Sequence, residues 1–222
     1  SFNNKVAVLS GDYLLATSLA QAAMTNNLDI ISIISSLGKD LADGELLQLS
    51  NIGNQEFSEE VYYDVIKKKT AVLFISCAKA GALSAGISDE KVQNAALIGE
   101  YIGICFQIKD DIFDYFRSEE TGKPSGNDMQ EGKLTLPVLH VLNTTDDEEA
   151  KRIALRVKQG VATSEEISYL VEFTKQHHGI EYALSMMDEY RNKALSLLDQ
   201  YEDGPVKSAI QAYLDYVINR NK

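Results

Sequence analysis

The sequence predicts a single all-α domain. Apolar residues recur at helical spacing almost throughout the 222 residues, and the composition is rich in Ala, Leu, Ile, Lys and Glu with only three prolines. Neither an internal repeat nor a convincing strand alternation occurs. Val72–Ile75 has strand propensity, but its flanks have the helical pattern. Hydrophobic residues make up 45% of the chain, which is enough for a sizeable core.

Two apolar helices are predicted near the start of the chain, from Val6 to Ala23 and from Leu28 to about Ser50. Both are apolar on more than one face, which indicates that each is buried on several sides. A helical segment follows from Phe57 to Gly86, with Ser58 as a plausible N-cap. Ser88 then begins a long helix that extends to about Arg117.

The segment from Ser118 to Lys133 lacks periodicity and contains three glycines and one proline, so it is predicted to be a loop. A short helix follows in LTLPVLHVL, with Pro137 near its start. Two residue pairs have the capping-box spacing: Thr145 with Glu148, and Thr163 with Glu166. Two helices close the chain, from His178 to Tyr201 and from Pro205 to Asn221, and Pro205 suits a first helical position.

The net charge of −12 argues against a general nucleic-acid binder, which needs a basic face. The first of the five arginines is Arg117, so the first half of the chain has no arginine that could bind a phosphate through two hydrogen bonds.

Cys77 and Cys105 lie in apolar runs. We predict that both are reduced core residues and that the protein is cytoplasmic. No run of eighteen apolar residues occurs, so we expect no membrane span. The chain starts without methionine or a signal-peptide pattern, and we expect a fragment.

Three aspartates stand in the largely apolar stretch GEYIGICFQIKDDIFDYF. On a helix, Asp110 and Asp114 lie on one face, and Asp111 lies about 100° around from Asp110. Gln107 joins the same stripe. Carboxylates this close repel one another, so the stripe predicts a polar cavity inside the bundle with a compensating cation. Mg²⁺ suits such a site because it takes one or two carboxylates and fills its other positions with water and phosphates.

Other interpretations of the stripe are open. An Asp-rich helix is commonly just a solvated surface, although Gly99, Gly103 and the flanking aromatics weigh against that here. A di-iron bundle needs Glu-x-x-His pairs, and none occurs. Zinc is disfavoured because histidines and cysteines do not cluster.

Basic residues that could face the same cavity come from two segments. Lys69 and Thr70 end the motif KKKT and could hold a phosphate at a helix break, although a solvated basic turn explains this motif at least as well. The loop supplies Lys123, Asp128 and Lys133. It directly follows the aspartate helix, so we expect it to reach the metal end of the cavity.

The segment FQIKDDIFDYF resembles the second aspartate-rich motif, DDxxD, of the trans-type polyprenyl diphosphate synthases. Four further segments resemble family motifs in the family's order: NKVAVLSGDYLLA, GELLQL, KKKTAVLF and TGKPSGNDMQEGKLTLPV. Five ordered motifs over about 130 residues are far more specific than DDxxD alone. The resemblance covers essentially the whole chain and implies an isoprenoid-synthase-like helical bundle around a central cavity.

The resemblance also implies a prenyltransferase that condenses an allylic diphosphate with isopentenyl diphosphate by Mg²⁺-assisted ionisation. It makes Asp110, Asp111 and Asp114 the metal ligands. It places Lys69, Lys123 and Lys133 on the allylic diphosphate. It has Thr70 and Gln107 line the same pocket and steady the cation and diphosphate, with Phe106 along the hydrocarbon end of the second substrate. Asp128 would support the metal ligands or the loop lysines.

In this family the first aspartate motif and the basic residues that bind isopentenyl diphosphate precede the segment that begins here at Asn4. No second DDxxD serves that role in this sequence, so we expect the chain to be inactive alone. The family also implies a homodimer through the first two helices. Two further functions stay open: a non-catalytic helical partner subunit of a heteromeric synthase, and a terpene-cyclase-like diphosphate lyase. The GKPSGNDMQEGK loop favours the chain-elongating enzymes.

Overall fold

The computed structural model describes residues 4–52, 56–116 and 125–220, and over these residues the protein is all-α with no strand, as predicted. The helices in chain order are α1 (Asn4–Met24), α2 (Leu28–Ile52), α3 (Glu59–Ile66), the π-helical turn η1 (Lys67–Ala71), α4 (Val72–Ser84), α5 (Asp89–Phe113), α6 (Asn127–Gln130), α7 (Leu136–Thr144), α8 (Glu148–Lys158), α9 (Ser164–Gln176), α10 (Gly179–Leu198) and α11 (Pro205–Asn219). The segment with strand propensity, Val72–Ile75, is therefore the start of α4.

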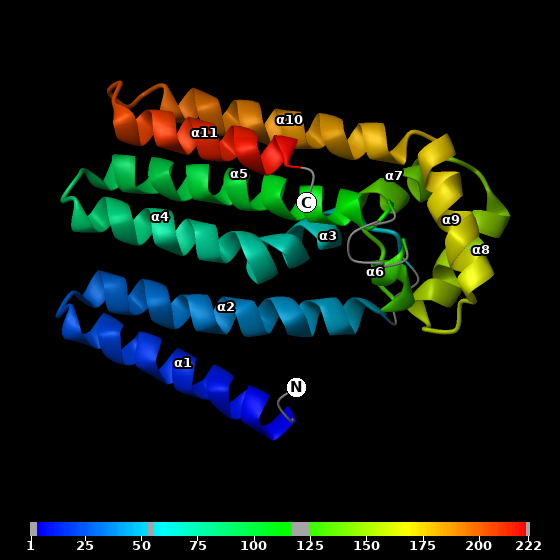
Figure 1. The fold of residues 1–222 in the computed structure, drawn as a ribbon, viewed down its shortest axis with the longest axis horizontal. Helices are drawn as coiled ribbons and strands as arrows, with labels where there is room; N and C mark the ends of the chain where they lie inside the picture. The colour runs from blue at the N-terminus through cyan, green and yellow to red at the C-terminus, as the bar shows by residue number, and fades with distance from the viewer. Residues whose placement is uncertain (1–3, 53–55, 117–124, 221–222) are drawn as a thin grey trace.

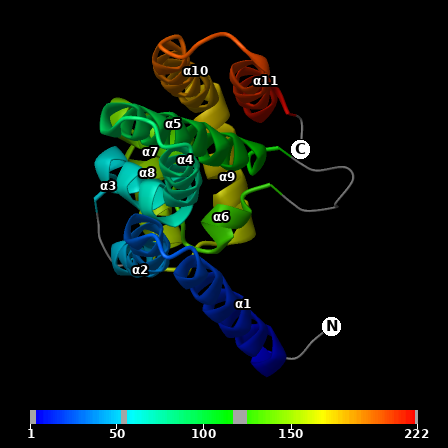
Figure 2. The ribbon, with the colours of Figure 1, turned by 90° about the vertical axis from the view of Figure 1, so that its left-hand side faces the viewer.

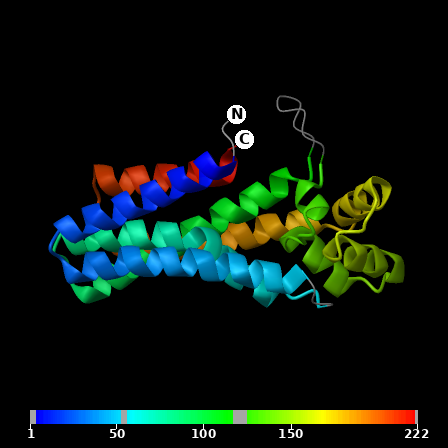
Figure 3. The same cartoon turned by 90° about the horizontal axis from the view of Figure 1, so that it is seen from below.

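The long helices α2, α4, α5, α10 and α11 run side by side, and α7, α8 and α9 gather at one end of them (Figure 1). The view from below shows the same division, with the yellow-green α8 and yellow α9 standing at that end (Figure 3). Helix α5 is the centre of the bundle because it packs against α4, α10, α11 and η1. Its residues Ile104, Cys105 and Ile108 are fully buried. Burial of each such apolar side chain stabilises the fold by about 1.5–3 kcal/mol.

Two glycines of α5 allow the backbones of α5 and its neighbours to touch. A Cβ on Gly103 would lie 2.5 Å from Ala71 Cα, and one on Gly99 would lie 2.6 Å from Phe74 O. On the other side of η1, a Cβ on Gly44 would lie 2.9 Å from Lys69 N. Only glycine fits at such approaches. The turn η1 is thereby clamped between α2 and α5.

Most predicted helix starts are confirmed. Ser58 caps α3 by accepting a hydrogen bond from Val61 N at 3.2 Å. Thr163 and Glu166 form both bonds of a capping box at the start of α9, and Pro205 opens α11.

The capping box predicted at Thr145 and Glu148 is wrong. Asp147 is the N-cap of α8 and accepts from Ala150 N at 2.7 Å. Thr145 instead ends α7, where its hydroxyl donates to Val141 O. Thr145 directly follows the last residue of α7, so its hydroxyl bonds to a carbonyl of α7 and does not cap α8.

Two other boundaries differ from the prediction. The long helix α5 ends at Phe113 rather than near Arg117, which lies outside the described residues. The predicted loop contains a four-residue helix, α6, which begins after Gly126 in the left-handed conformation with φ 82°.

Helix α1 leaves the bundle at an angle, so that its N-terminal end stands apart from the other helices (Figure 2). Only Ala22 of α1 is buried, and Leu9 and Tyr13 are 66% and 71% exposed. The prediction that this helix is buried on several sides is therefore wrong for the single chain. It is wrong for α2 as well, where Leu46 and Leu49 are 65% and 56% exposed. By length and mean hydropathy α1 would also suffice to cross a membrane, contrary to our expectation, although one such helix near an N-terminus is weak evidence for a span.

Cys105 is buried as predicted, but the prediction that Cys77 lies in the core is wrong, because its side chain is exposed. Helix α4 is apolar around most of its circumference but buries only Val72 and Ser76. Because the run that contains Cys77 is apolar on all sides, its sequence does not indicate which face of α4 packs against α5 and which face stays exposed.

Candidate active site

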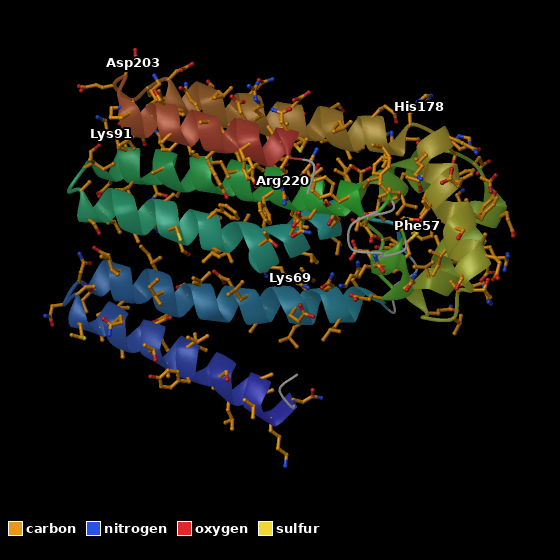
Figure 4. The ribbon with its side chains drawn as sticks, in the orientation of Figure 1. Phe57, Lys69, Lys91, His178, Asp203 and Arg220 are labelled. Atoms are coloured by element: carbon orange, nitrogen blue, oxygen red, sulfur yellow. The ribbon has the colours of Figure 1, made fainter. Side chains whose placement is uncertain are left out.

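A polar cavity of about 130 Å³ lies where α2, α3, η1 and α5 meet the segment that follows α6. Lys69, labelled in Figure 4, lies at this junction. The charged and amide-bearing residues that line the cavity come from several elements: Gln48, Asn51, Glu56, Lys69, Gln107, Asp111, Asp128, Lys133 and Lys158. The cavity thus gathers residues of both signs that are distant in the sequence.

The turn η1 places Lys69 and Thr70 on this cavity. A π-helical turn inserts one extra residue between α3 and α4, and such insertions occur frequently at functional sites. Thr70 donates a hydrogen bond to Gln107 Oε1 at 2.7 Å. The Lys69 ammonium donates to Gln48 Oε1 at 2.6 Å and pairs with Glu45 at 2.8 Å.

Asp111 is the most deeply buried charged group of the cavity, with 4% of its surface exposed. Tyr62 donates to one carboxylate oxygen at 2.6 Å, and Gln107 Nε2 donates to the other at 2.8 Å. The pKa of Asp111 is raised to about 7, chiefly by burial and also by the charges of Asp128 and Asp110, which together outweigh the two hydrogen bonds. Neither of these two hydrogen-bond partners, which are the ones found among the described residues, carries a positive charge.

The other two aspartates of the stripe do not line the cavity, so the expectation that all three point into it is wrong. Asp110 is paired with Arg220, the residue that follows α11. The Asp114 carboxylate accepts hydrogen bonds from Asn127 N at 2.9 Å and Asp128 N at 3.0 Å. Among the described residues, no group of three or more acidic, His or Cys side chains is arranged to hold a metal ion.

The loop residues Asp128 and Lys133 do reach the cavity, and Lys133 Nζ lies 3.9 Å from Asp128 Oδ1. Burial, followed by the charge of Asp114, raises the pKa of Asp128, and Lys133 opposes this rise. Lys123 lies outside the described residues. Phe106 does not line the cavity, because its ring packs 5.6 Å from that of Phe74 and beneath the guanidinium of Arg220.

Several residues of the site were not assigned from the sequence. Gln48 lies within GELLQL, so a motif pointed to it without giving it a role. Tyr62 carries no spacing signal, since only the fold brings it to Asp111, 49 positions later. Lys158 and Arg220 likewise arrive from distant helices.

Comparisons with known proteins agree with this architecture. A family model described as polyprenyl synthetase matches residues 1–174. The crystal structure of geranylgeranyl pyrophosphate synthase from Bacteroides thetaiotaomicron has a TM-score of 0.94 and 61% identity, over 99% of this chain and 73% of that one. Polyprenyl synthase from Caulobacter crescentus, complexed with calcium and isoprenyl diphosphate, has a TM-score of 0.89 and 30% identity, over 98% of this chain and 67% of that one.

Among curated relatives, heptaprenyl diphosphate synthase component 2 of Bacillus subtilis is 32% identical over 221 residues, which are 99% of this chain and 62% of the relative. The chain therefore spans about two thirds of the length of such proteins. The family model covers most of the chain, and the structural agreement extends over nearly all of it. The chain accordingly belongs to the polyprenyl synthetase family.

Proposed function

We propose that the protein is a prenyltransferase that condenses an allylic diphosphate with isopentenyl diphosphate and requires Mg²⁺. The observation that carries this proposal is the cavity in which buried Asp111, bonded through Gln107 to Thr70, shares one polar space with Lys69 and Lys133. The Caulobacter crescentus relative was crystallised with calcium and isoprenyl diphosphate, which supports both ligand classes for this fold.

The chemical type of the oxygen donors, rather than their present arrangement, fits a hard divalent cation. The donors at the cavity are carboxylate and amide oxygens, which suit Mg²⁺ rather than zinc. We assign Asp110, Asp111 and Asp114 as its ligands, directly or through water. When bound, the cation would neutralise charge on the diphosphate leaving group. It would also place a positive charge beside buried Asp111.

The lysines of the chain would bind and orient the diphosphate. Lys69 and Lys133 are held at present by Glu45 and Glu131, whose side chains are about half exposed or more. Pairs of this kind contribute little to stability, so a diphosphate could replace them at small cost. We assign Lys123 the same role through the resemblance alone.

The neutral residues would steady the bound groups. The hydrogen bond from Thr70 fixes the amide of Gln107, and the amide nitrogen of Gln107 in turn orients Asp111. We assign Phe106 to the hydrocarbon end of the second substrate. In that role its ring would first have to lose its contact with Arg220.

We further propose that the 222 residues alone do not elongate a prenyl chain, because they contain one DDxxD motif where the family resemblance implies two. Loss of one preorganised charge contact costs about 3–4 kcal/mol of transition-state stabilisation, and loss of all the carboxylates of one DDxxD motif costs more. A cytoplasmic location is proposed with this function.

We also propose a homodimer that covers the apolar faces of α1 and α2. Val8 and Leu14 of α1 are 63% and 64% exposed, and contiguous exposed apolar surface marks an interface. A non-catalytic subunit of a heteromeric synthase is the second candidate, since one relative is named as component 2 of such an enzyme.

The test uses radiolabelled isopentenyl diphosphate with an allylic primer. It compares this chain with a chimera that joins it to the part of the Bacteroides thetaiotaomicron synthase that it does not match. The chimera should form product with Mg²⁺ and lose it with EDTA, and Asp111→Asn should lower the rate by about 10²–10³. The control Asp146→Asn changes a 97% exposed carboxylate and should retain full activity. Robust product from the 222 residues alone would contradict the proposal of inactivity, and an inactive chimera would favour the partner subunit.

A further inference from the structure

Arg220 follows the last turn of α11 and reaches across to α5, where Figure 4 labels it beside that helix. Only 11% of its side chain is exposed. Its Nη2 pairs with Asp110 and donates to Phe106 O at 3.1 Å. The guanidinium carbon lies 4.3 Å from the ring centroid of Phe106 and 5.3 Å from that of Phe113.

This one side chain covers two residues to which the proposed function gives roles. Asp110 and Phe106 are the assigned metal ligand and hydrocarbon contact, and neither lines the cavity. An oxygen of Asp110 that accepts from a guanidinium has one fewer lone pair for a cation. The face of Phe106 beneath Arg220 is likewise closed to a hydrocarbon chain.

In this position over Asp110 and Phe106, the guanidinium of Arg220 does not make all of its hydrogen bonds. Its Nε is buried and has no hydrogen-bond partner among the residues that the structure describes. Lys109 is a like charge close by, since its Nζ lies 5.1 Å from the ring centroid of Phe113, the ring that Arg220 also contacts. An apolar groove of about 430 Å³, lined by Ile102 and Val206 among others, also separates the start of α11 from α5. The groove loosens only the start of α11, whereas the end that carries Arg220 is fixed in the core by Leu214 and Val217, so the Arg220 side chain can move without the helix.

We propose that Arg220 is an intramolecular counter-ion that holds Asp110 and covers Phe106 until a divalent cation and a diphosphate compete for Asp110. Release of Arg220 then uncovers both residues together. The proposal rests on the proposed function in taking Asp110 as a metal ligand. Charge complementarity supports it, because a cation at the stripe would repel the guanidinium from the place it now occupies.

The first test is calorimetric titration of the protein with Mg²⁺ in the presence of inorganic pyrophosphate. Arg220→Gln removes the competitor, so affinity should rise by a factor of about 5, which corresponds to about 1 kcal/mol for such an ion pair. Arg191→Gln is the matched control, because Arg191 tethers α11 through Asp215 at 2.7 Å without touching Asp110. It should leave affinity unchanged. Equal or weaker affinity of Arg220→Gln would overturn the proposal.

The second test needs no metal and separates this proposal from the proposed function. Trypsin cleaves after Arg220 only when the side chain is released, and mass spectrometry measures the rate. Asp110→Asn should raise that rate by a factor of about 5, and Asp215→Asn should raise it less. Equal rates for wild type and Asp110→Asn would overturn the counter-ion role whatever the metal result. If pyrophosphate and Mg²⁺ bind to no variant, the release step and the proposed function both fail.

Discussion

Substituting Gly103 by alanine tests whether close contact between α5 and η1 builds the cavity. The new Cβ would lie 2.5 Å from Ala71 Cα, whereas non-bonded carbons contact at about 3.5–4.0 Å. The two segments must therefore separate by roughly 1 Å. Overpacking of this kind costs about 1–3 kcal/mol, and stretching the Thr70–Gln107 hydrogen bond costs about 1 kcal/mol more. Alanine recovers up to about 1 kcal/mol in helix propensity, which leaves a net loss of about 1–3 kcal/mol.

The assay is urea unfolding followed by circular dichroism, together with thermal melting, where each kcal/mol shifts Tm by about 2–4 °C for a chain of this size. Gly81→Ala is the matched control, because Gly81 lies in α4 and no atom lies within 4 Å of its added Cβ. It should stabilise the protein by about 0.4–1 kcal/mol. If Gly103→Ala is as stable as Gly81→Ala, the backbone clash does not exist and the clamp on η1 is not the reason for the cavity's geometry.

Three further substitutions follow from the contacts. Tyr62→Phe leaves a buried oxygen of Asp111 without its donor and should cost about 1–3 kcal/mol in urea unfolding, whereas an effect near zero would show that water replaces the hydroxyl. Asp147→Ala should lower stability by about 1 kcal/mol and Thr145→Ala by less, because only Asp147 caps α8, and the reverse order in thermal melts would contradict that cap. Asp114→Ala should speed amide hydrogen exchange at residues 127 and 128 by about tenfold, and unchanged exchange would refute the anchoring of α6.

The sequence predicted the helices well because helical periodicity is a local property. Ser58 and Pro205 act at the helix starts that their residue types indicate. The prediction fails where two neighbouring elements compete for one side chain, as at Thr145, whose hydroxyl bonds back to α7. It also fails for α1, because an apolar helix has the same composition whether its faces are covered or open.

The candidate site was predictable in composition but not in arrangement. The stripe of α5 and the KKKT turn supplied Asp111, Gln107, Lys69 and Thr70, which do meet at one cavity. Helical spacing puts the three aspartates on one side of α5, yet it cannot say which partner each carboxylate finds. Arg220 lies 110 positions from Asp110, and no local pattern reports a contact of that kind.

Asp114 connects the aspartate stripe to the segment that carries Asp128 and Lys133, two of the charged residues of the cavity. Its backbone oxygen accepts from Gly126 N at 2.8 Å, and its carboxylate accepts from the amides of Asn127 and Asp128. These amides open α6 and have no partner within that helix. The next link is the bond from Lys133 N to Asp128 O at 2.8 Å. If Asp114 turned toward a cation, its amide partners would lose their acceptor, and the backbone that holds Lys133 would shift with them. In the proposed function, the position of the diphosphate-binding lysine therefore depends on the same carboxylate that binds the metal.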